Sequence, residues 1–276
     1  MRWGRRLAAL TLALGLMACG DDGPKEVEPT GDAFADYEDG RVSVIGTDPD
    51  GVSGAASAAL QSGDCVVIGD SCQTAAELGC QGDDPIDVVV DNGQVVDVLC
   101  YGDVDQPTVV VDSSQTGGID VPQNDNGAVL VFDAALDGQP IQGDLSIDAN
   151  NVTLYGNGPE NTIIEGDLVL TGNNTRVRGV TVTGNVTVTL NNASLVLTQV
   201  RGNLRLEQNN ATIASCQVFG NIESESNNHI LTDNGVGGAL QLGGNGYQCG
   251  SNYAFIDAND DFIVTDDERG ATLSCP

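Results

Sequence analysis

An eighteen-residue repeat is the feature that most constrains what this chain can fold into. Its copies open with Gly166-Asp-Leu-Val-Leu, Gly184-Asn-Val-Thr-Val, Gly202-Asn-Leu-Arg-Leu and Gly220-Asn-Ile-Glu-Ser. Gly238 continues the register, and an earlier copy that begins at Gly143 is longer. A short fixed period indicates that one structural unit stacks on the next, so that contacts between neighbouring copies dominate the fold.

Apolar residues inside each copy alternate with polar ones, which is the pattern of short β-strands. Leu168 and Leu170 stand two and four residues after their glycine, and Leu204 and Leu206 do the same. Two further apolar columns are predicted to point inward: Leu154, Val177, Leu195, Ile213, Leu231 and Cys249, and Val182, Val200, Val218, Val236 and Ala254. We therefore predict an all-β chain whose main part is a β-solenoid of about six coils, stacked ~4.8 Å apart.

Pairs of asparagines recur with the same period. They are Asn150 and Asn151, Asn173 and Asn174, Asn191 and Asn192, Asn209 and Asn210, and Asn227 and Asn228. Asparagine tolerates left-handed backbone geometry, and its amide both donates and accepts hydrogen bonds. We expect a structural asparagine ladder along one corner of the solenoid.

Several stretches of the repeat resemble a known superfamily. They are Asn150-Asn-Val-Thr-Leu-Tyr-Gly-Asn-Gly158, Thr162-Ile-Ile-Glu-Gly166 and Arg176-Val-Arg-Gly-Val-Thr-Val182. Together they resemble the pectin-lyase-like right-handed parallel β-helix proteins, over roughly residues 106–256. A left-handed hexapeptide helix is the alternative, but the apolar columns are not spaced six residues apart. The resemblance implies the fold and, because it consists of turn and core residues, little about activity.

The N-terminus reads as a secretion signal. Arg2, Arg5 and Arg6 precede an apolar run that ends at Met17 and is too short to span a bilayer. The segment Leu16-Met-Ala-Cys19-Gly20 resembles the lipobox of bacterial lipoproteins, which implies a signal peptide at 1–18 and a lipidated Cys19. Because Gly20 and not Asp follows the cysteine, the resemblance favours the outer membrane or cell surface. The alternative is an ordinary secretory signal with an incidental cysteine.

Two regions separate this signal from the repeat. Residues 19–40 have the acidic, Gly/Pro-rich composition of a flexible tether. Residues 41–105 are predicted to form a small β-rich module, with a hairpin between 86–90 and 95–100 because Asn92-Gly93 favours a tight turn. The module contains Cys65, Cys72, Cys80 and Cys100, and four cysteines in a small exported region suggest two disulfides with three possible pairings. Their spacing argues against a zinc site, and free buried thiols are the alternative.

The net charge excludes one class of partner. The chain has 40 acidic against 10 basic residues, a formal net charge of -30. Such a surface repels phosphate backbones, so we expect no nucleic-acid partner. The acidity is unevenly distributed, since residues 143–255 hold nine of the 40 acids.

One outward-facing patch of the repeat could carry chemistry. Stacking is expected to place Glu207 beside Glu225 and Arg205 beside Glu223. Neighbouring carboxylates can raise one pKa toward that of a general acid or share a cation, as in the polysaccharide lyases that the fold resembles. Arg205, Glu207 and Glu225 are therefore weak catalytic candidates, and the alternative that we favour is a solvated face. His229 is expected to fill a turn or edge.

The C-terminal residues 257–276 are predicted to form a cap. Asp257, Asn259, Asp261 and Glu268 have the spacing of calcium ligands in an EF-hand loop, but Phe262 occupies the position of the required glycine. We therefore favour a capping strand and turn without a cofactor, with Ca²⁺ as the alternative. Cys249 and Cys275 are predicted to staple this cap, which leaves Cys216 as a buried thiol.

These features together predict a non-enzymatic envelope or surface protein with a structural or adhesive role. It would be attached to the membrane through Cys19 and would meet a cell-surface glycan or protein. The alternative is a glycan-binding or polysaccharide-cleaving β-helix, a lyase or a glycoside hydrolase.

Overall fold

The computed structural model describes most of the chain after residue 78. Before that point it describes the backbone of six short strands, and after it residues 79–80, 85–91, 94–104, 107–112 and 118–275. Within these ranges the side chains of residues 90, 91, 134 and 266 are not described. Cys19, together with most of the predicted signal and tether, lies outside the described residues.

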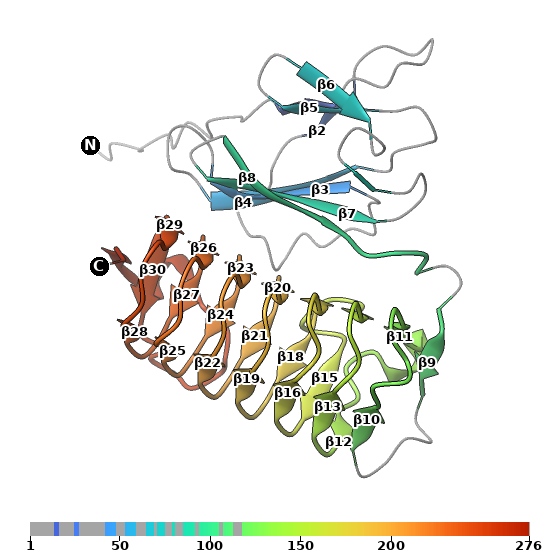
Figure 1. Ribbon diagram of the computed structural model, residues 1–276. Coiled ribbons are helices and arrows are strands. Elements are labelled where there is room, and N and C mark those ends of the chain that lie inside the picture. The colour runs from blue at the N-terminus through green and yellow to red at the C-terminus, as the bar shows by residue number, and fades with distance from the viewer. Residues whose placement is uncertain are drawn as a thin grey trace, which may run out of the picture.

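Three sheets form a parallel β-solenoid, drawn in green to red in Figure 1. The open sheet contains β10 (Ile119–Val121), β13 (Leu145–Ile147), β16 (Leu168–Leu170), β19 (Val186–Val188), β22 (Leu204–Leu206), β25 (Ile222–Ser224) and β28 (Leu240–Leu242). The docking sheet contains β9 (Val109–Val111), β11 (Val129–Phe132), β14 (Thr153–Tyr155), β17 (Arg176–Arg178), β20 (Ser194–Val196), β23 (Thr212–Ala214), β26 (Ile230–Thr232) and β29 (Gln248–Gly250).

The third sheet, which we name the cap sheet, completes each coil. It contains β12 (Ile141–Gln142), β15 (Ile163–Glu165), β18 (Thr181–Val182), β21 (Gln199–Val200), β24 (Gln217–Val218), β27 (Gly235–Val236), β30 (Asn252–Phe255) and β31 (Arg269–Leu273). All its neighbouring strands are parallel except β30 and β31, which are antiparallel. Two 3-10 helices, η1 (Ala134–Leu136) and η2 (Asp266–Glu268), lie in connections.

The β-solenoid predicted from the repeat is confirmed, but it is longer than about six coils. The docking sheet has eight strands, which corresponds to about eight turns. The additional turns are formed by β9 to β12, before Gly143. Their connections differ in length, so the eighteen-residue period does not reveal them.

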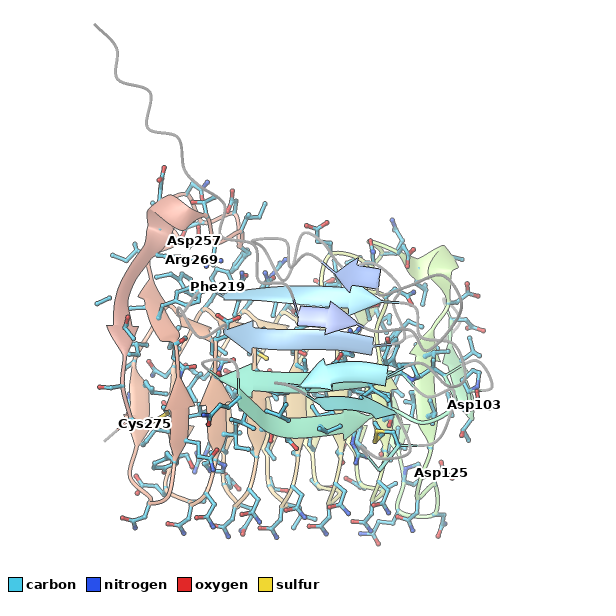
Figure 2. All side chains as sticks on the ribbon, turned by 90° about the horizontal axis from the view of Figure 1, so that it is seen from above. Asp103, Asp125, Phe219, Asp257, Arg269 and Cys275 are labelled. Carbon is cyan, nitrogen blue, oxygen red and sulfur yellow. A yellow bond between two sulfur atoms is a disulfide. The ribbon has the colours of Figure 1, made fainter. Side chains whose placement is uncertain are left out.

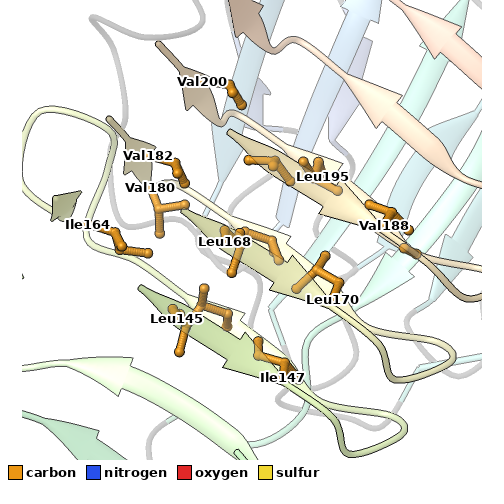
Figure 3. Close-up of a cluster of buried hydrophobic side chains, with 14 of the residues drawn as sticks. Leu145, Ile147, Ile164, Leu168, Leu170, Val180, Val182, Val188, Leu195 and Val200 are labelled. Atoms are coloured by element: carbon orange, nitrogen blue, oxygen red, sulfur yellow. The ribbon is translucent and has the colours of Figure 1, made fainter. Parts of the chain in front are cut away.

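Apolar columns fill the interior of the coils. Leu145 lies over Leu168 in the strand register, and Ile147 lies over Leu170, and each of these side chains is at most 1% exposed. Figure 3 shows how these side chains from successive coils gather in the interior. The inward columns that the sequence predicted are therefore the core, up to the last coil.

The glycine that opens each copy is explained by the close approach of neighbouring coils. A Cβ atom on Gly202 would lie 2.6 Å from the carbonyl oxygen of Gly184, and one on Gly220 would lie 2.6 Å from that of Gly202. These distances are shorter than non-bonded atoms allow, so a side chain there would force the coils apart.

The asparagine pairs form a ladder at the corner between the open and docking sheets. Asn151, Asn174, Asn192 and Asn210 have φ between 56° and 62°, the left-handed geometry that asparagine tolerates. Their Nδ2 atoms donate to the Oδ1 of the preceding coil at 2.8 to 3.1 Å, starting with Asn174 to Asn151. In the adjoining column, the backbone N–H of Asn209 donates to Asn191 Oδ1 at 3.1 Å.

A second ladder follows the opening glycines. The backbone N–H of Asn203 donates to Asn185 Oδ1 at 3.0 Å, and that of Asn221 donates to Asn203 Oδ1 at 2.8 Å. Asp167 fills the same column one coil earlier, where its Oδ1 accepts from the N–H of Asn185 at 2.7 Å. Two side-chain ladders thus connect successive coils, one at each end of the open-sheet strands.

The N-terminal module contains a four-stranded sheet in the order β4-β3-β7-β8. Its strands are β3 (Val42–Thr47), β4 (Ser53–Ala58), β7 (Ile86–Asp91) and β8 (Gln94–Cys100), while β5 (Cys65–Ile68) pairs with β6 (Ser71–Thr74) and β1 (Leu14–Leu16) with β2 (Lys25–Val27). The predicted hairpin is confirmed, since β7 and β8 are antiparallel neighbours. Cys80 and Cys100 form a disulfide, and the side chains of Cys65 and Cys72 lie outside the described residues.

This module lies on the outer face of the docking sheet. Figure 1 shows the sheet above the coils, and Figure 2 shows its strands running along the row of coils, across the direction of the solenoid strands. Leu99 and Tyr101 belong to the same buried cluster as Val196 and Ala214 of the docking sheet. Outward-pointing side chains of the docking sheet are therefore buried by a segment that precedes the repeat.

The C-terminal end of the solenoid is closed by a strand and a disulfide. Cys249 and Cys275 are bonded, with Cα atoms 5.8 Å apart, which is the pairing that the sequence predicted. Cys216 is a free thiol in the interior, and burial raises its pKa to about 12.

The ladder makes a prediction for Asn192. Asn192→Ala removes two amide hydrogen bonds and places alanine, which tolerates left-handed geometry less well than asparagine, at φ 60°. We therefore expect a loss of about 2 kcal/mol of unfolding free energy. Asn192→Gly removes the same bonds without the backbone strain and should lose about half as much. Thr187→Ala on the open sheet is the control and should stay within about 0.5 kcal/mol. Urea denaturation measures all three, and equal losses for alanine and glycine would contradict this account.

Candidate functional site

The contact between module and solenoid is centred on a buried ion pair. Arg178 Nε of β17 lies 2.7 Å from Asp87 Oδ2 of β7, and both side chains are at most 2% exposed. The hydroxyl of Tyr101 donates to the same Asp87 oxygen at 2.6 Å. Burial, reinforced by the charge of Asp87, raises the pKa of Tyr101 well above its ordinary value, so this donor stays protonated.

Aromatic rings enclose the guanidinium of this ion pair. The Cζ atom of Arg178 lies 5.1 Å from the ring centre of Tyr155 and 5.7 Å from that of Tyr101. The two rings meet edge to face, with centres 5.3 Å apart. Because a ring face attracts a cation, the rings partly replace the water that Arg178 loses on burial.

A groove opens beside this contact, between strand β8 and the asparagine ladder. It measures about 390 Å³, and we name it the ladder groove. Its floor contains the corner residues Asn151, Asn174, Asn192, Asn210 and Asn228, and the outward-facing Arg176, Ser194, Thr212 and Ile230. Asp97, Val98 and Leu99 of β8 form the opposite wall. The groove is thus polar and extends over successive coils.

The residues that the sequence singled out for chemistry lie in a different hollow, on the open sheet. Arg205, Glu207, Glu223, Glu225 and Gln241 line a space of about 430 Å³. Strand register places Arg205 beside Glu223, but the ion pair forms between Arg205 Nε and Glu207 Oε1 at 3.0 Å. Both partners are solvent-exposed, and such a pair contributes little to stability. The hollow therefore holds three carboxylates and one arginine, of which Glu223 is half-buried and accepts a hydrogen bond from Asn221 Nδ2 at 3.2 Å.

His229 lies in the turn between β25 and β26, as expected, and its side chain is fully buried in the interior of the solenoid. The backbone N–H of Ala211 donates to its Nδ1 at 3.0 Å, so that in the neutral ring the proton is on Nε2. Nε2 lies 3.0 Å from Ser224 Oγ and 2.9 Å from Ser226 Oγ. Ser224 stands where the preceding coils have Leu206 and Val188, and this smaller side chain leaves room for the imidazole. Burial lowers the pKa of His229 to about 4, and both ring nitrogens are occupied, so it is unsuited to act as a base on a substrate.

The acidic C-terminal loop uses its carboxylates to hold its own backbone. Asp257 accepts from the N–H groups of Asp261 and Phe262, at 3.3 and 3.1 Å. Glu268 accepts from the N–H groups of Thr265 and Ala258, both at 3.0 Å, and these bonds lower its pKa. Asn259 Nδ2 donates to Asp261 Oδ2 at 2.8 Å. Among the described residues, no group of three or more His, Cys, Asp and Glu is placed to hold a metal ion.

Phe262 attaches this loop to the cap sheet. Its ring centre lies 5.1 Å from that of Phe219 and 4.3 Å from the Cζ atom of Arg201. Its carbonyl accepts from Gln199 Nε2 at 2.8 Å. The residue at the glycine position of the EF-hand pattern therefore covers the outer face of the cap sheet.

Sequence reasoning located the open-sheet hollow and the cap but missed the ladder groove and the ion pair. Asp87 and Arg178 are 91 residues apart and belong to different structural units. One available signal was Asp87 itself, because it is a charged residue within the otherwise apolar run 86–90 of the predicted hairpin.

Comparison of the chain with protein-family models, curated proteins and solved structures finds no match. In the described part of the chain, no helix is long and apolar enough to span a membrane. The fold defines the class of protein, a parallel β-solenoid with an N-terminal module docked on one face.

The ion pair makes a prediction for Asp87. Asp87→Ala leaves Arg178 buried without its counter-charge, so we expect a loss of about 3–5 kcal/mol and faster proteolysis of the module. Glu223→Ala on the open sheet is the control and should change stability by less than about 0.5 kcal/mol. Urea denaturation measures the loss of stability, and limited chymotrypsin digestion measures the proteolysis, because residues 42–175 contain no Lys or Arg for trypsin to cleave. An Asp87→Ala protein as stable as the control variant would contradict the buried ion pair.

His229 makes a prediction about acid. Its pKa is about 4 in the folded protein, below the ordinary value of 6.5, so the unfolded chain binds a proton first as the pH falls. This contribution to stability is full above pH 6.5 and decreases between pH 6.5 and about 4. His229→Asn keeps an acceptor for Ala211 N–H and does not titrate. Unfolding free energies of both proteins from pH 7 to 4.5 should show a difference that changes with pH, whereas a constant difference would contradict the buried neutral imidazole.

Proposed function

We propose that this chain is a non-enzymatic, lipid-anchored β-helix protein of the bacterial outer membrane or cell surface, with a structural or adhesive role. The single observation that carries the proposal is the use of its reactive side chains in holding the fold. His229 closes the interior, Arg178 and Asp87 dock the module, and Asp257 and Glu268 shape the cap loop. Such a role requires no cofactor.

The distribution of open and covered faces supports the same proposal. The docking sheet is covered by the module, and the cap sheet is contacted by the C-terminal loop. The open sheet presents residues of mixed character, including Thr187, Arg205 and Gln241. A rod with one available face and a tethered end suits a display or spacer role, with a cell-surface protein or glycan as partner.

The membrane attachment in this proposal rests on the lipobox resemblance at Cys19. Several acyl chains on one residue would anchor the protein stably, where a single chain holds marginally. The 19–40 segment would then separate the folded part from the bilayer.

A second candidate is glycan binding or cleavage in the open-sheet hollow, by a solenoid similar to the pectin-lyase-like proteins. The observation that favours it is the convergence of Glu207, Glu223 and Glu225 with Arg205. Two features favour the non-enzymatic role: the lining contains no aromatic ring on which a sugar could stack, and Arg205 is paired with Glu207.

A polysaccharide screen separates the two candidates. We expect the full chain to release no unsaturated or reducing ends from acidic or neutral polysaccharides. Glu207→Gln and Glu225→Gln should leave that baseline unchanged. Cleavage that either substitution abolishes would contradict the non-enzymatic proposal and support the alternative.

Membrane fractionation tests the anchor. The unaltered chain should be recovered with the envelope membranes and extracted by detergent, because its acyl chains are buried in lipid. Cys19→Ser should shift the protein to the soluble fraction, and Cys216→Ser should not. A Cys19→Ser protein that stays in the membranes would contradict lipid anchoring.

A further inference from the structure

The ladder groove contains a cation without a counter-ion. Arg176 is half-buried on β17, and among the described residues its guanidinium has no hydrogen-bond or ion-pair partner. Arg178, two residues later, is paired with Asp87. A partly desolvated guanidinium favours a carboxylate, which it can bind through two parallel hydrogen bonds.

Asp97 is the one acid among the residues that line the groove, and both of its carboxylate oxygens accept hydrogen bonds. Asp97 Oδ1 accepts from the backbone N–H of Val98 at 2.8 Å, and Asp97 Oδ2 accepts from Thr212 Oγ1 at 2.6 Å. The repeat around the groove is also far less acidic than the chain, since residues 143–255 hold nine of its 40 acids. Within the lining of the groove, an anionic group at Arg176 therefore meets one carboxylate, that of Asp97 on the opposite wall.

The module contributes an unpaired strand edge to the same groove. β8 is the last strand of the β4-β3-β7-β8 sheet. The N–H of Tyr101 donates to the carbonyl of Pro85 at 3.0 Å, so the alternation of an antiparallel pair directs the main chain of Val98 away from β7. Because the N–H of Val98 already donates to the side chain of Asp97, the carbonyl of Val98 is the group left to accept a hydrogen bond from a ligand. Such an edge pairs with an extended peptide.

The floor of the groove adds regularly spaced amides. Asn174, Asn192 and Asn210 each use one Nδ2 hydrogen in the ladder. A carboxamide nitrogen carries two hydrogens, so each of them retains one for a ligand. Because β8 and the ladder both run along the row of coils (Figure 2), a ligand would lie extended between them.

We propose that the ladder groove binds an extended peptide segment that carries an acidic side chain. Its carboxylate binds Arg176, its main chain donates to the edge of β8, and the asparagine amides contact its other side. The strand edge favours a peptide over an acidic glycan, as does the lack of an aromatic ring among the lining residues. This inference deepens the proposed adhesive role and rests on it, because it names the class of partner.

Calorimetric titration of the full chain tests the proposal. The probe is a heptapeptide of alternating threonine and glutamate with blocked ends, and the matched probe has glutamine in place of glutamate. We expect the glutamate peptide to bind at least about tenfold more tightly than the glutamine peptide. Arg176→Gln should remove this preference, Arg176→Lys should retain part of it, and Arg205→Gln on the open sheet should leave it unchanged. Melting temperatures of the variants show whether each remains folded.

Each other outcome overturns the inference. It is wrong if neither peptide binds, if the two bind equally, if folded Arg176→Gln retains the preference, or if oligogalacturonate binds at Arg176 and the peptide does not. Attachment of the anchored protein to cells, measured in parallel, separates the two proposals. Attachment without peptide binding overturns the peptide site alone, whereas polysaccharide cleavage overturns the proposed function.

Discussion

The structure depends on parallel hydrogen bonding between coils in a constant register. Because Val186 pairs with Leu204 and Leu204 with Ile222, each position in one coil lies over the same position in the next. This stacking turns single residue types into columns, so that leucine and valine fill the interior and asparagine amides bond along the axis. It also brings coils so close at the opening position that glycine is required there.

Function follows from what each face of this stack meets. The docking sheet is occupied by the module, whose attachment concentrates in the Asp87–Arg178 ion pair and the surrounding tyrosines. That attachment leaves a groove along its margin, which is lined by Arg176, the ladder asparagines and residues 97–99 of β8. The open sheet keeps its charged side chains in water. A solenoid built in this way can bind a partner through such a groove, which is why we favour a structural or adhesive role.

The sequence predicted the features that a fixed period or local chemistry determines, and missed those that depend on contacts between distant segments. The columns through Leu154 and Val182, the asparagine corner and the β7–β8 hairpin follow from local chemistry and a fixed period. The burial of the His229 side chain was not predicted, because it depends on Ser224, which takes the place of Leu206 and Val188 only in that coil. The ladder groove could not be predicted, since it arises where a module without the repeat docks on the solenoid.

The central claim is that the module and the solenoid form one folded unit, in which the module covers the outer face of the docking sheet. Amide hydrogen exchange of the full chain, followed by mass spectrometry, tests it most directly. The account predicts that peptides from β7, which lies between β3 and β8, exchange as slowly as those from β17 and β20. Rapid exchange in β7 beside a protected solenoid would contradict it.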